Sequence, residues 1–497
     1  MTSNTAVILT SLRRQFPRLV MGASAILALA MVAPTIQGAA APSRWQKITN
    51  QPTFNTDTAN LLTDGRVLVH QYNGTQWWLF TPDINGSYLN GTWSAAGSMQ
   101  NGYQPLYFAN AVLPDGRVIV EGGEYNNLQA VWTNQGAIYN PLTNTWTQVN
   151  PPAGWANIGD SPGIVQPDGV FMMGQGGISS TKQVLFNPST LTWTAISNTG
   201  KSDTYSEEGF ALLPNSKILL VDCANIPNSE IYDPATQKWT SAGSTGQALP
   251  DAGSLEVGPA ILRPDGNVTW FGGTPHTGIY NPTTGTWSPG PNYPGGNDSA
   301  DGPATLLPDG TIYLPASPGV FQGVITNFIF DGTSFTQIAD TQSSRSLQSW
   351  QTRTLMLPTG QVMYLVADGR TKDVELLTSK GRPDPSWAPV ITTIQSVVTR
   401  GSTVLVTGQQ FNGMSACSDY GDDALSATNY PIARLTNQAT GHVFYCRTHD
   451  HSTMAVATGA TPVSTSVDIP ANAETGQSKF VIIANGIASR PARVTVQ

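Results

Sequence analysis

Charged residues are scarce in this chain of 497 residues. It has only 24 Lys and Arg and 32 Asp and Glu, so 11% of its residues are charged, whereas about a quarter is typical of a soluble domain. The formal net charge is −8. No Lys/Arg cluster follows the first forty residues, so we expect no binding to nucleic acid. With 49 Gly and 36 Pro, the composition excludes a coiled coil or helical bundle and favours short strands and turns.

Long apolar runs are also missing, except near the start of the chain. Arg13, Arg14 and Arg18 precede an apolar run over 19–34, and three Ala follow at 39–41. This pattern predicts a signal peptide over residues 1–41, and therefore a secreted or periplasmic protein. The paired arginines favour the twin-arginine export route. The alternative is an uncleaved anchor, although the run is shorter than the roughly 20 residues that span a bilayer. After processing, we expect a monomer that does not span a membrane.

Cysteine is the third scarce residue, with three in the chain. Cys223 follows the apolar run 218–221 and is expected to be a buried core thiol. It has no His or second Cys near it in sequence, which argues against a catalytic or metal-binding role. Cys417 and Cys446 both lie in the last hundred residues. In an oxidising compartment they are the expected disulfide pair.

A repeat with a period near 50 residues runs through most of the chain. Seven segments combine a small residue, apolar residues, a Pro-Asp-Gly-like turn and a β-rich run. The turn positions are Gly65, Gly116, Gly169, Ser216, Gly266, Gly310 and Gly360. Pro fixes φ and Gly permits positive φ, so each segment is expected to form a hairpin. This period is typical of kelch repeats, in which each repeat forms one four-stranded propeller blade.

Aromatic residues mark the second half of the repeats. The positions equivalent to one another are Trp93, Trp146, Trp193, Trp239, Trp287 and Phe335. The seventh turn has no such partner after it, but Trp45 and the residues that follow it resemble the segment at Trp146. We therefore expect the N-terminal strand to be the outer strand of the last blade and to close the ring. Most Trp residues are expected to pack the blades, although Trp77, Trp78, Trp155 and Trp270 could instead form a sugar-stacking platform.

The pattern changes after Pro389, where short strands without the repeat continue to the end. The predicted fold is therefore all-β, with a seven-bladed kelch-type β-propeller over 42–387 followed by an immunoglobulin-like β-sandwich over 388–497. This organisation, together with the stretches 430–435, 445–451 and 485–487, resembles the galactose oxidase and glyoxal oxidase group. In that group, one His of the C-terminal domain descends into the propeller and binds copper. The propeller supplies a copper-binding Tyr-His pair and a radical-forming Tyr cross-linked to a Cys.

The resemblance implies positions for these residues nine or ten places before the turn of a blade. Trp350 and Gln351 stand where the Tyr-His pair is expected. Tyr107 replaces the Cys, and Asp160 replaces the radical Tyr. Only His449 fits the copper-ligand pattern. Copper is therefore not the expected cofactor, because Cu(II) needs several N or O ligands and the thioether-linked radical needs the missing Cys.

The positions nine or ten residues before the turns of the blades are rich in acids. The candidate ligand-binding residues there are Tyr107, Asp160, Glu207, Glu208, Glu256, Asp301, Trp350 and Gln351. Because the offset is shared, these side chains should meet at one mouth of the central channel. Crowded carboxylates raise one another's pKa or attract Ca²⁺ or another divalent cation, and two of them could act as acid and base on a sugar. The alternative is structural, with each acid capping backbone N–H groups.

His449 and His451 lie two residues apart, so on a strand they share a face. They are candidate metal ligands above the acids, or a hydrogen-bonded pair at the domain interface. The favoured function is a secreted propeller that binds a carbohydrate, small polyol or cell-envelope polymer at the channel mouth, with a cation and without copper-radical oxidase activity. The alternative is a galactose-oxidase-like or other carbohydrate-active enzyme with a rebuilt acidic site.

Overall fold

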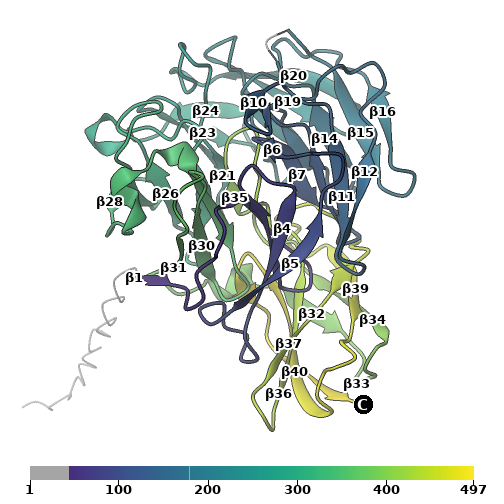
Figure 1. Ribbon diagram of the computed structural model, residues 1–497. Coiled ribbons are helices and arrows are strands. Elements are labelled where there is room, and N and C mark those ends of the chain that lie inside the picture. Colours follow the sequence, from purple (N-terminus) through teal and green to yellow (C-terminus); the bar gives the residue numbers. More distant parts are fainter. Residues whose placement is uncertain (1–43, 178) are drawn as a thin grey trace, which may run out of the picture. The chain divides into compact units, whose positions relative to one another are not determined.

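The computed structural model describes residues 44–177 and 179–497, which are built from short β-strands (Figure 1). The described helical elements are the 3-10 turns η1 (Pro294–Gly296), η2 (Ser343–Ser346), η3 (Ser349–Gln351) and η4 (Pro385–Trp387). No described helix is long and apolar enough to cross a membrane. The predicted signal peptide over 1–41 lies outside the described residues.

Seven antiparallel sheets of four propeller strands each follow one another and form the blades. The strands of blades 1 to 4, from inner to outer, are β2 (Thr56–Leu61), β3 (Val67–Gln71), β4 (Gln76–Thr81) and β5 (Thr92–Ser98); β7 (Ala109–Val112), β8 (Val118–Glu121), β11 (Gly136–Asn140) and β12 (Thr145–Val149); β13 (Gly163–Val165), β14 (Phe171–Gly174), β15 (Gln183–Asn187) and β16 (Thr192–Ile196); β17 (Ala211–Leu212), β18 (Ile218–Val221), β19 (Asn228–Asp233) and β20 (Lys238–Ser244).

Blades 5 to 7 repeat the same order. Their strands are β21 (Ala260–Leu262), β22 (Val268–Phe271), β23 (Thr277–Asn281) and β24 (Thr286–Pro289); β25 (Ala304–Leu306), β26 (Ile312–Ala316), β27 (Thr326–Phe330) and β28 (Phe335–Gln337); β29 (Thr352–Met356), β30 (Gln361–Val366), β31 (Val374–Thr378) and β1 (Arg44–Lys47). A small extra sheet contains β6 (Pro105–Leu106), β9 (Tyr125–Asn126) and β10 (Gln129–Ala130). The innermost strands of neighbouring blades contact one another and surround a central channel.

The predicted hairpin turns join the first and second strand of each blade. In blade 2, the Leu113 N–H donates to the Arg117 carbonyl, and Gly116 N–H donates back to the Leu113 carbonyl, each over 2.8 Å. Gly116 has φ of +83°, which an L side chain rarely adopts. Asp115 accepts a hydrogen bond from the Arg117 backbone N–H at 2.9 Å. The turn is therefore specified by local chemistry, which explains why the repeat is visible in the sequence.

The N-terminal strand closes the ring, as the sequence predicts. Strand β1 pairs antiparallel with β31, with Trp45 opposite Leu377. The indole of Trp45 donates to the Ala339 carbonyl at 2.8 Å and packs edge-on against Tyr313 and Tyr364 in blades 6 and 7. The seventh blade is therefore made from both ends of the propeller sequence.

Deleting residues 42–49 should lower the free energy of unfolding by roughly 3 kcal/mol or more, because it exposes the apolar surface under Trp45 and leaves the edge of β31 unpaired. Urea unfolding of the deletion variant and of Trp45→Ala would measure the loss. Gln46→Ala, in the same strand, is the control and should change stability little. A deletion variant as stable as the intact protein would contradict ring closure.

The repeated Trp residues pack the blades. Trp146 and Trp239 are buried, and each lies 5.1–5.2 Å from a Tyr on the neighbouring strand of its own blade. The alternative of a sugar-stacking platform is wrong for the other four indoles. Trp77, Trp155 and Trp270 are buried, and Trp78 is stacked on Phe54 at 4.5 Å.

The C-terminal part is the predicted sandwich of two sheets. One sheet has the order β32 (Val390–Thr393), β34 (Thr403–Gln409), β39 (Pro462–Asp468) and β38 (Thr448–His449). The other has β33 (Val397–Val398), β42 (Ala492–Val496), β40 (Gly476–Ala484), β36 (Ile432–Asn437) and β37 (Val443–Cys446), with β41 (Ile487–Ala488) against β40. The described residues from 44 onward form one compact unit, so the domain boundary at 387–388 remains a prediction.

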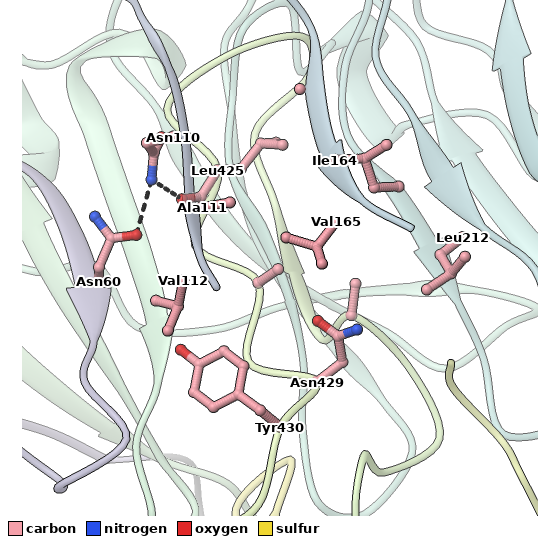
Figure 2. A pocket seen from close by; sticks show the side chains of 13 residues that line it. Asn60, Asn110, Ala111, Val112, Ile164, Val165, Leu212, Leu425, Asn429 and Tyr430 are labelled. Carbon is pink, nitrogen blue, oxygen red and sulfur yellow. Dashed lines mark hydrogen bonds between the residues drawn. The ribbon is translucent and has the colours of Figure 1, made fainter. Parts of the chain in front are cut away.

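Residues 413–430 leave the sandwich and run through the propeller channel; we call this segment the finger. Its short strand β35 (Ser418–Asp419) pairs with β25, the innermost strand of blade 6. Figure 2 shows Leu425 and Tyr430 of the finger among side chains of blades 2 to 4. Asn110 of blade 2 donates to the Leu425 carbonyl at 2.7 Å. The cavity left beside the finger holds only about 40 Å³, so the finger fills this part of the channel.

The predicted disulfide between Cys417 and Cys446 is wrong. All three cysteines lie in the described part of the chain, and all three are buried free thiols. Cys417 belongs to the finger and packs with blade 6, where its Sγ lies 3.3 Å from the Leu306 carbonyl. Cys446 ends β37 in the core of the sandwich. The prediction assumed that two cysteines close in sequence are also close in space. The finger instead places Cys417 against blade 6, away from the sandwich. Cys223 is a buried core thiol, as predicted.

Candidate functional site

The acids at the predicted offset do meet at one mouth of the channel. Carboxylate oxygens of Asp160 and Glu207, which precede blades 3 and 4, lie within 4.8 Å of one another and of an oxygen of Asp422. Glu256 and Asp301, which precede blades 5 and 6, are close enough that the charge of Asp301 raises the pKa of Glu256. We call these five residues the mouth cluster.

The backbone is unusual where it delivers these side chains. Tyr107, Glu207 and Asp301 have φ of +54°, +57° and +46°, and each lies just before the innermost strand of its blade. A left-handed conformation at a residue other than Gly costs of the order of 1–3 kcal/mol and is common at functional sites. Three blades therefore tolerate the same backbone strain at the same position, where it directs a polar or aromatic side chain to the mouth.

Asp422 reaches the mouth cluster from the finger. The tip of the finger passes close to Gly209, where a Cβ atom would lie only 2.1 Å from the Gly421 carbonyl oxygen. Only glycine fits at residue 209 without moving the tip. Asp422 is 4% exposed, and its Oδ2 has no hydrogen-bond partner. One oxygen each of Asp160 and Glu256 is likewise buried and without a hydrogen-bond partner. The cluster therefore has free oxygen ligands directed inward.

Burial and mutual repulsion hold protons on these acids. Burial, reinforced by Asp422, raises the pKa of Asp160 and of Glu207 well above the usual range. Burial likewise raises the pKa of Asp301 to about 7 and, more strongly, that of Glu256. Glu124 in the loop after β8 is half-buried beside them, and burial together with Asp422 raises its pKa to about 7. A bound cation would reverse these shifts by stabilising the ionised forms.

Arg353, the second residue of strand β29, faces the acids. Its guanidinium is 2% exposed, lies 3.4 Å from Asp57 and donates to the Trp350 carbonyl at 2.7 Å. It also lies 4.2 Å from the ring centroid of Tyr420 in the finger. Asp57 in turn bonds to His70 at 2.9 Å. This positive group offsets part of the negative charge on one side of the mouth, and it lowers the pKa of Asp301 and Asp423 against the larger effect of burial.

Two of the predicted aromatic and polar residues have clear positions. Tyr107 and Trp350 are half-buried neighbours at the mouth, with ring centroids 6.2 Å apart. Gln351 has a structural contact, since its side-chain oxygen accepts the Gln348 backbone N–H at 3.0 Å at the start of η3. The aromatic pair therefore lies beside the acids, whereas Gln351 is occupied by its own turn.

Three predicted residues do not belong to the mouth cluster. Glu208 points into blade 4, where it pairs with Lys201 at 2.9 Å. The expectation that His449 and His451 lie above the acids is wrong. His449 is in β38 of the sandwich and contacts Asp450 and Asp468, and His451 bonds to Thr465. The neighbouring Thr448 bonds to Thr63, at the turn end of blade 1, which is the opposite end of the channel from the mouth.

Sequence reasoning missed the acids of the finger, namely Asp422 and Asp423, and the charged residues Glu124 and Arg353. A signal for the finger was present: residues 417–423 contain three Asp in a chain that has few charges, and they lie in a long segment with hardly any strand. Long segments without secondary structure inside a compact domain are usually functional.

The donor set of the mouth suits a hard cation. Two oxygens bound to one Ca²⁺ at about 2.4 Å can be at most about 4.8 Å apart, which matches Asp160, Glu207 and Asp422. The residues present do not fit the copper-radical group. All five His lie among the described residues, and none belongs to the mouth cluster. The nearby thiol of Cys223 is buried and donates to the Glu207 backbone carbonyl.

The comparisons with known proteins agree with the fold. The sequence matches no protein-family model and shows no significant similarity to a curated protein. Among solved structures, a copper-bound fungal alcohol oxidase of the AA5 family is similar over 93% of this chain and 100% of its own, with 13% identity and a TM-score of 0.51. The protein YjhT is similar over 59% of this chain and 99% of its own, with 14% identity and a TM-score of 0.42. The first of these likenesses agrees with a β-propeller followed by a sandwich, and at this identity it is a likeness of fold.

Proposed function

We propose that this protein is an exported kelch propeller that binds a divalent cation at its channel mouth and, through that cation, a carbohydrate or small polyol. Ca²⁺ is the cation that the oxygen donors favour. Ca²⁺ takes six to eight oxygen ligands, so three carboxylates leave positions for the hydroxyl groups of a polyol. Asp160 and Glu207 are half-buried, so a ligand can approach them from solvent. The half-buried rings of Tyr107 and Trp350 beside them would contact the apolar face of a sugar.

The observation that carries this proposal is the convergence of Asp160, Glu207 and Asp422 from two blades and the finger. Two like charges about 4 Å apart repel each other by about 4 kcal/mol at an effective dielectric near 20. A cation converts that repulsion into attraction. Capping of backbone N–H groups does not explain the arrangement, because Asp160 and Asp422 each keep a buried oxygen without a hydrogen-bond partner.

Calcium titration calorimetry tests the proposal. Wild-type protein, freed of metal, should bind Ca²⁺ at the mouth, and Asp422→Asn should weaken this binding at least tenfold because one of three charged ligands becomes neutral. Asp265→Asn, in the exposed turn of blade 5, is the matched control. A galactose or glycerol titration of the Ca²⁺-loaded protein would then test the polyol. Equal affinity of wild type and Asp422→Asn for Ca²⁺ would overturn the mouth as a cation site.

Copper-loaded protein should release no hydrogen peroxide from galactose or glyoxal, because Tyr107, Asp160, Trp350 and Gln351 replace the residues of the radical cofactor and its copper ligands. A peroxidase-coupled assay measures this, with a copper-radical oxidase as positive control. Turnover that is lost in Asp422→Asn but kept in Asp265→Asn would show that the mouth is an oxidase site after all.

The alternative of a carbohydrate-active enzyme rests on the neighbouring carboxyl groups of Glu256 and Asp301, because burial raises the pKa of both. Glycoside hydrolases hold their two carboxyl groups about 5 Å or more apart so that a sugar can lie between them. The carboxylate oxygens of Asp160, Glu207 and Asp422 lie within 4.8 Å of one another, which is closer than this separation. Binding therefore accounts for this geometry better than glycoside hydrolysis does.

A further inference from the structure

A second group of acids lies inside blade 4, apart from the mouth cluster. Carboxylate oxygens of Asp203, Glu208 and Asp222 lie within 4.8 Å of one another. All three residues are buried, with exposed fractions of 6%, 0% and 0%. Asp203 and Glu208 come from the loop before β17, and Asp222 follows β18 directly. The three side chains therefore come from two separate segments, a loop and the end of a strand, which the fold brings together.

The charges of this group do not balance. Lys201 is fully buried and pairs with Glu208 at 2.9 Å and with Glu230 at 2.7 Å. Counting these two glutamates with Asp203 and Asp222, four carboxyl groups face one ammonium group. Buried charges normally occur only when they are paired, so this imbalance requires protons or a further cation.

The hydrogen bonds show where the missing positive charge belongs. Asp203 accepts three backbone N–H groups, from Thr204, Ala224 and Asn225, at 2.8 to 3.0 Å, so both of its oxygens have partners. Asp222 is the opposite case, because both of its oxygens are buried and neither has a hydrogen-bond partner. A buried carboxyl group without any partner is costly even when it is protonated, since its O–H is also unsatisfied.

We propose that Asp203, Glu208 and Asp222 bind a divalent cation, Ca²⁺ by the nature and spacing of the donors, at a buried site in blade 4. The oxygens are no further apart than Ca²⁺ requires. The cation satisfies both oxygens of Asp222 and fixes the loop of residues 201–208 to the end of β18. This site is structural and closed to solvent, in contrast to the half-exposed mouth, and it does not depend on the proposed function of the mouth.

Equilibrium dialysis against Ca²⁺ at 0.1 mM, followed by elemental analysis, tests both sites at once. Wild type and Asp265→Asn should hold two Ca²⁺ per chain. Asp222→Asn and Asp422→Asn should each hold one, because each variant neutralises a ligand of a different site. If Asp222→Asn holds as many ions as wild type, the site in blade 4 is overturned. If instead only Asp422→Asn retains the wild-type number, the mouth proposal fails and the site in blade 4 stands.

A measurement on the unaltered protein covers the case in which Asp222→Asn does not fold. Removing Ca²⁺ with chelator should speed amide hydrogen exchange at least tenfold in residues 201–230, while the equivalent segment of blade 5 changes little. Release of this ion should also be slow compared with release from the mouth, because the site is closed. Unchanged exchange in residues 201–230 after complete removal of metal would overturn the proposal.

Discussion

Protein treated with chelator should lose stability as the pH rises from 5 to 8, which is the reverse of ordinary acid denaturation. Burial raises the pKa of Asp298 and of Asp419 to about 7, and neither carboxyl group belongs to a proposed cation site. An acid whose pKa is higher in the folded protein holds its proton more tightly there than in the unfolded chain. Its contribution to stability is therefore complete below about pH 4 and is lost as the pH rises through 7. Between pH 5 and pH 8 each group loses up to about 3 kcal/mol of its contribution to stability, because about two pH units of that range lie below the folded pKa of about 7.

Thermal melts in EDTA at pH 5 and pH 8, at constant ionic strength, measure this effect. The melting temperature should be several degrees lower at pH 8. Asp298→Asn should reduce the dependence on pH, whereas Asp265→Asn should leave it unchanged. Added Ca²⁺ should stabilise the protein at pH 8 by binding the ionised acids of the two clusters, but the loss that comes from Asp298 and Asp419 should remain, because neither belongs to a proposed cation site. A melting temperature that rises between pH 5 and pH 8 in EDTA would show that the buried acids are ionised and compensated in the folded protein.

Replacing Arg353 by Met should destabilise the protein by about 3–5 kcal/mol, because it leaves buried carboxylates without their cation. Arg353 is 2% exposed and faces Asp57 and Asp423, while its other contacts are to Tyr420 and to backbone carbonyls. Met fills most of the volume but supplies no charge and no donor. Urea unfolding at pH 7 gives the difference in free energy.

Arg117→Met is the matched control, because Arg117 pairs with Asp115 in a partly exposed turn at 2.6 Å. Such pairs contribute less than about 1 kcal/mol. In an Asp423→Asn background, the cost of Arg353→Met should shrink, since less negative charge is left unpaired. Similar losses for Arg353→Met and Arg117→Met would mean that the mouth gains little from its buried cation.

The blades could be predicted from the sequence because each hairpin turn is specified by residues that are adjacent in the chain. Gly116 and Asp115 form their turn from local hydrogen bonds, and the same pattern recurs in the other blades. The ring closure could also be predicted, because Trp45 has the same neighbours as its equivalents. The offset of the acids followed from the turns, and it identified Asp160 and Glu207 at the mouth, but it also included Glu208, which pairs with Lys201, and it missed Asp422.

The finger could not be predicted, because its position is set by contacts with blades far away in sequence. Strand β35 has two residues and exists only against β25, so no periodic pattern marks it. Missing the finger led directly to two errors. It placed Cys417 beside Cys446, and it left His449 as the only residue that could descend into the channel. The prediction for Glu208 was wrong for a different reason. Glu207 and Glu208 are adjacent, and the left-handed φ at Glu207 directs their two side chains to different environments.

The finger also allows residues of the mouth to change while the blades stay the same. Its tip, residues 420–423, contributes Tyr420 and Asp422 to the site but belongs to no blade, and the strict steric limit found there is on Gly209 of the propeller. A substitution of Asp422 would therefore change one of the three proposed cation ligands while every turn and every strand of the ring stayed the same. Because Asp160 and Glu207 come from the propeller, the tip is the part of the proposed site that can be redesigned without altering the ring.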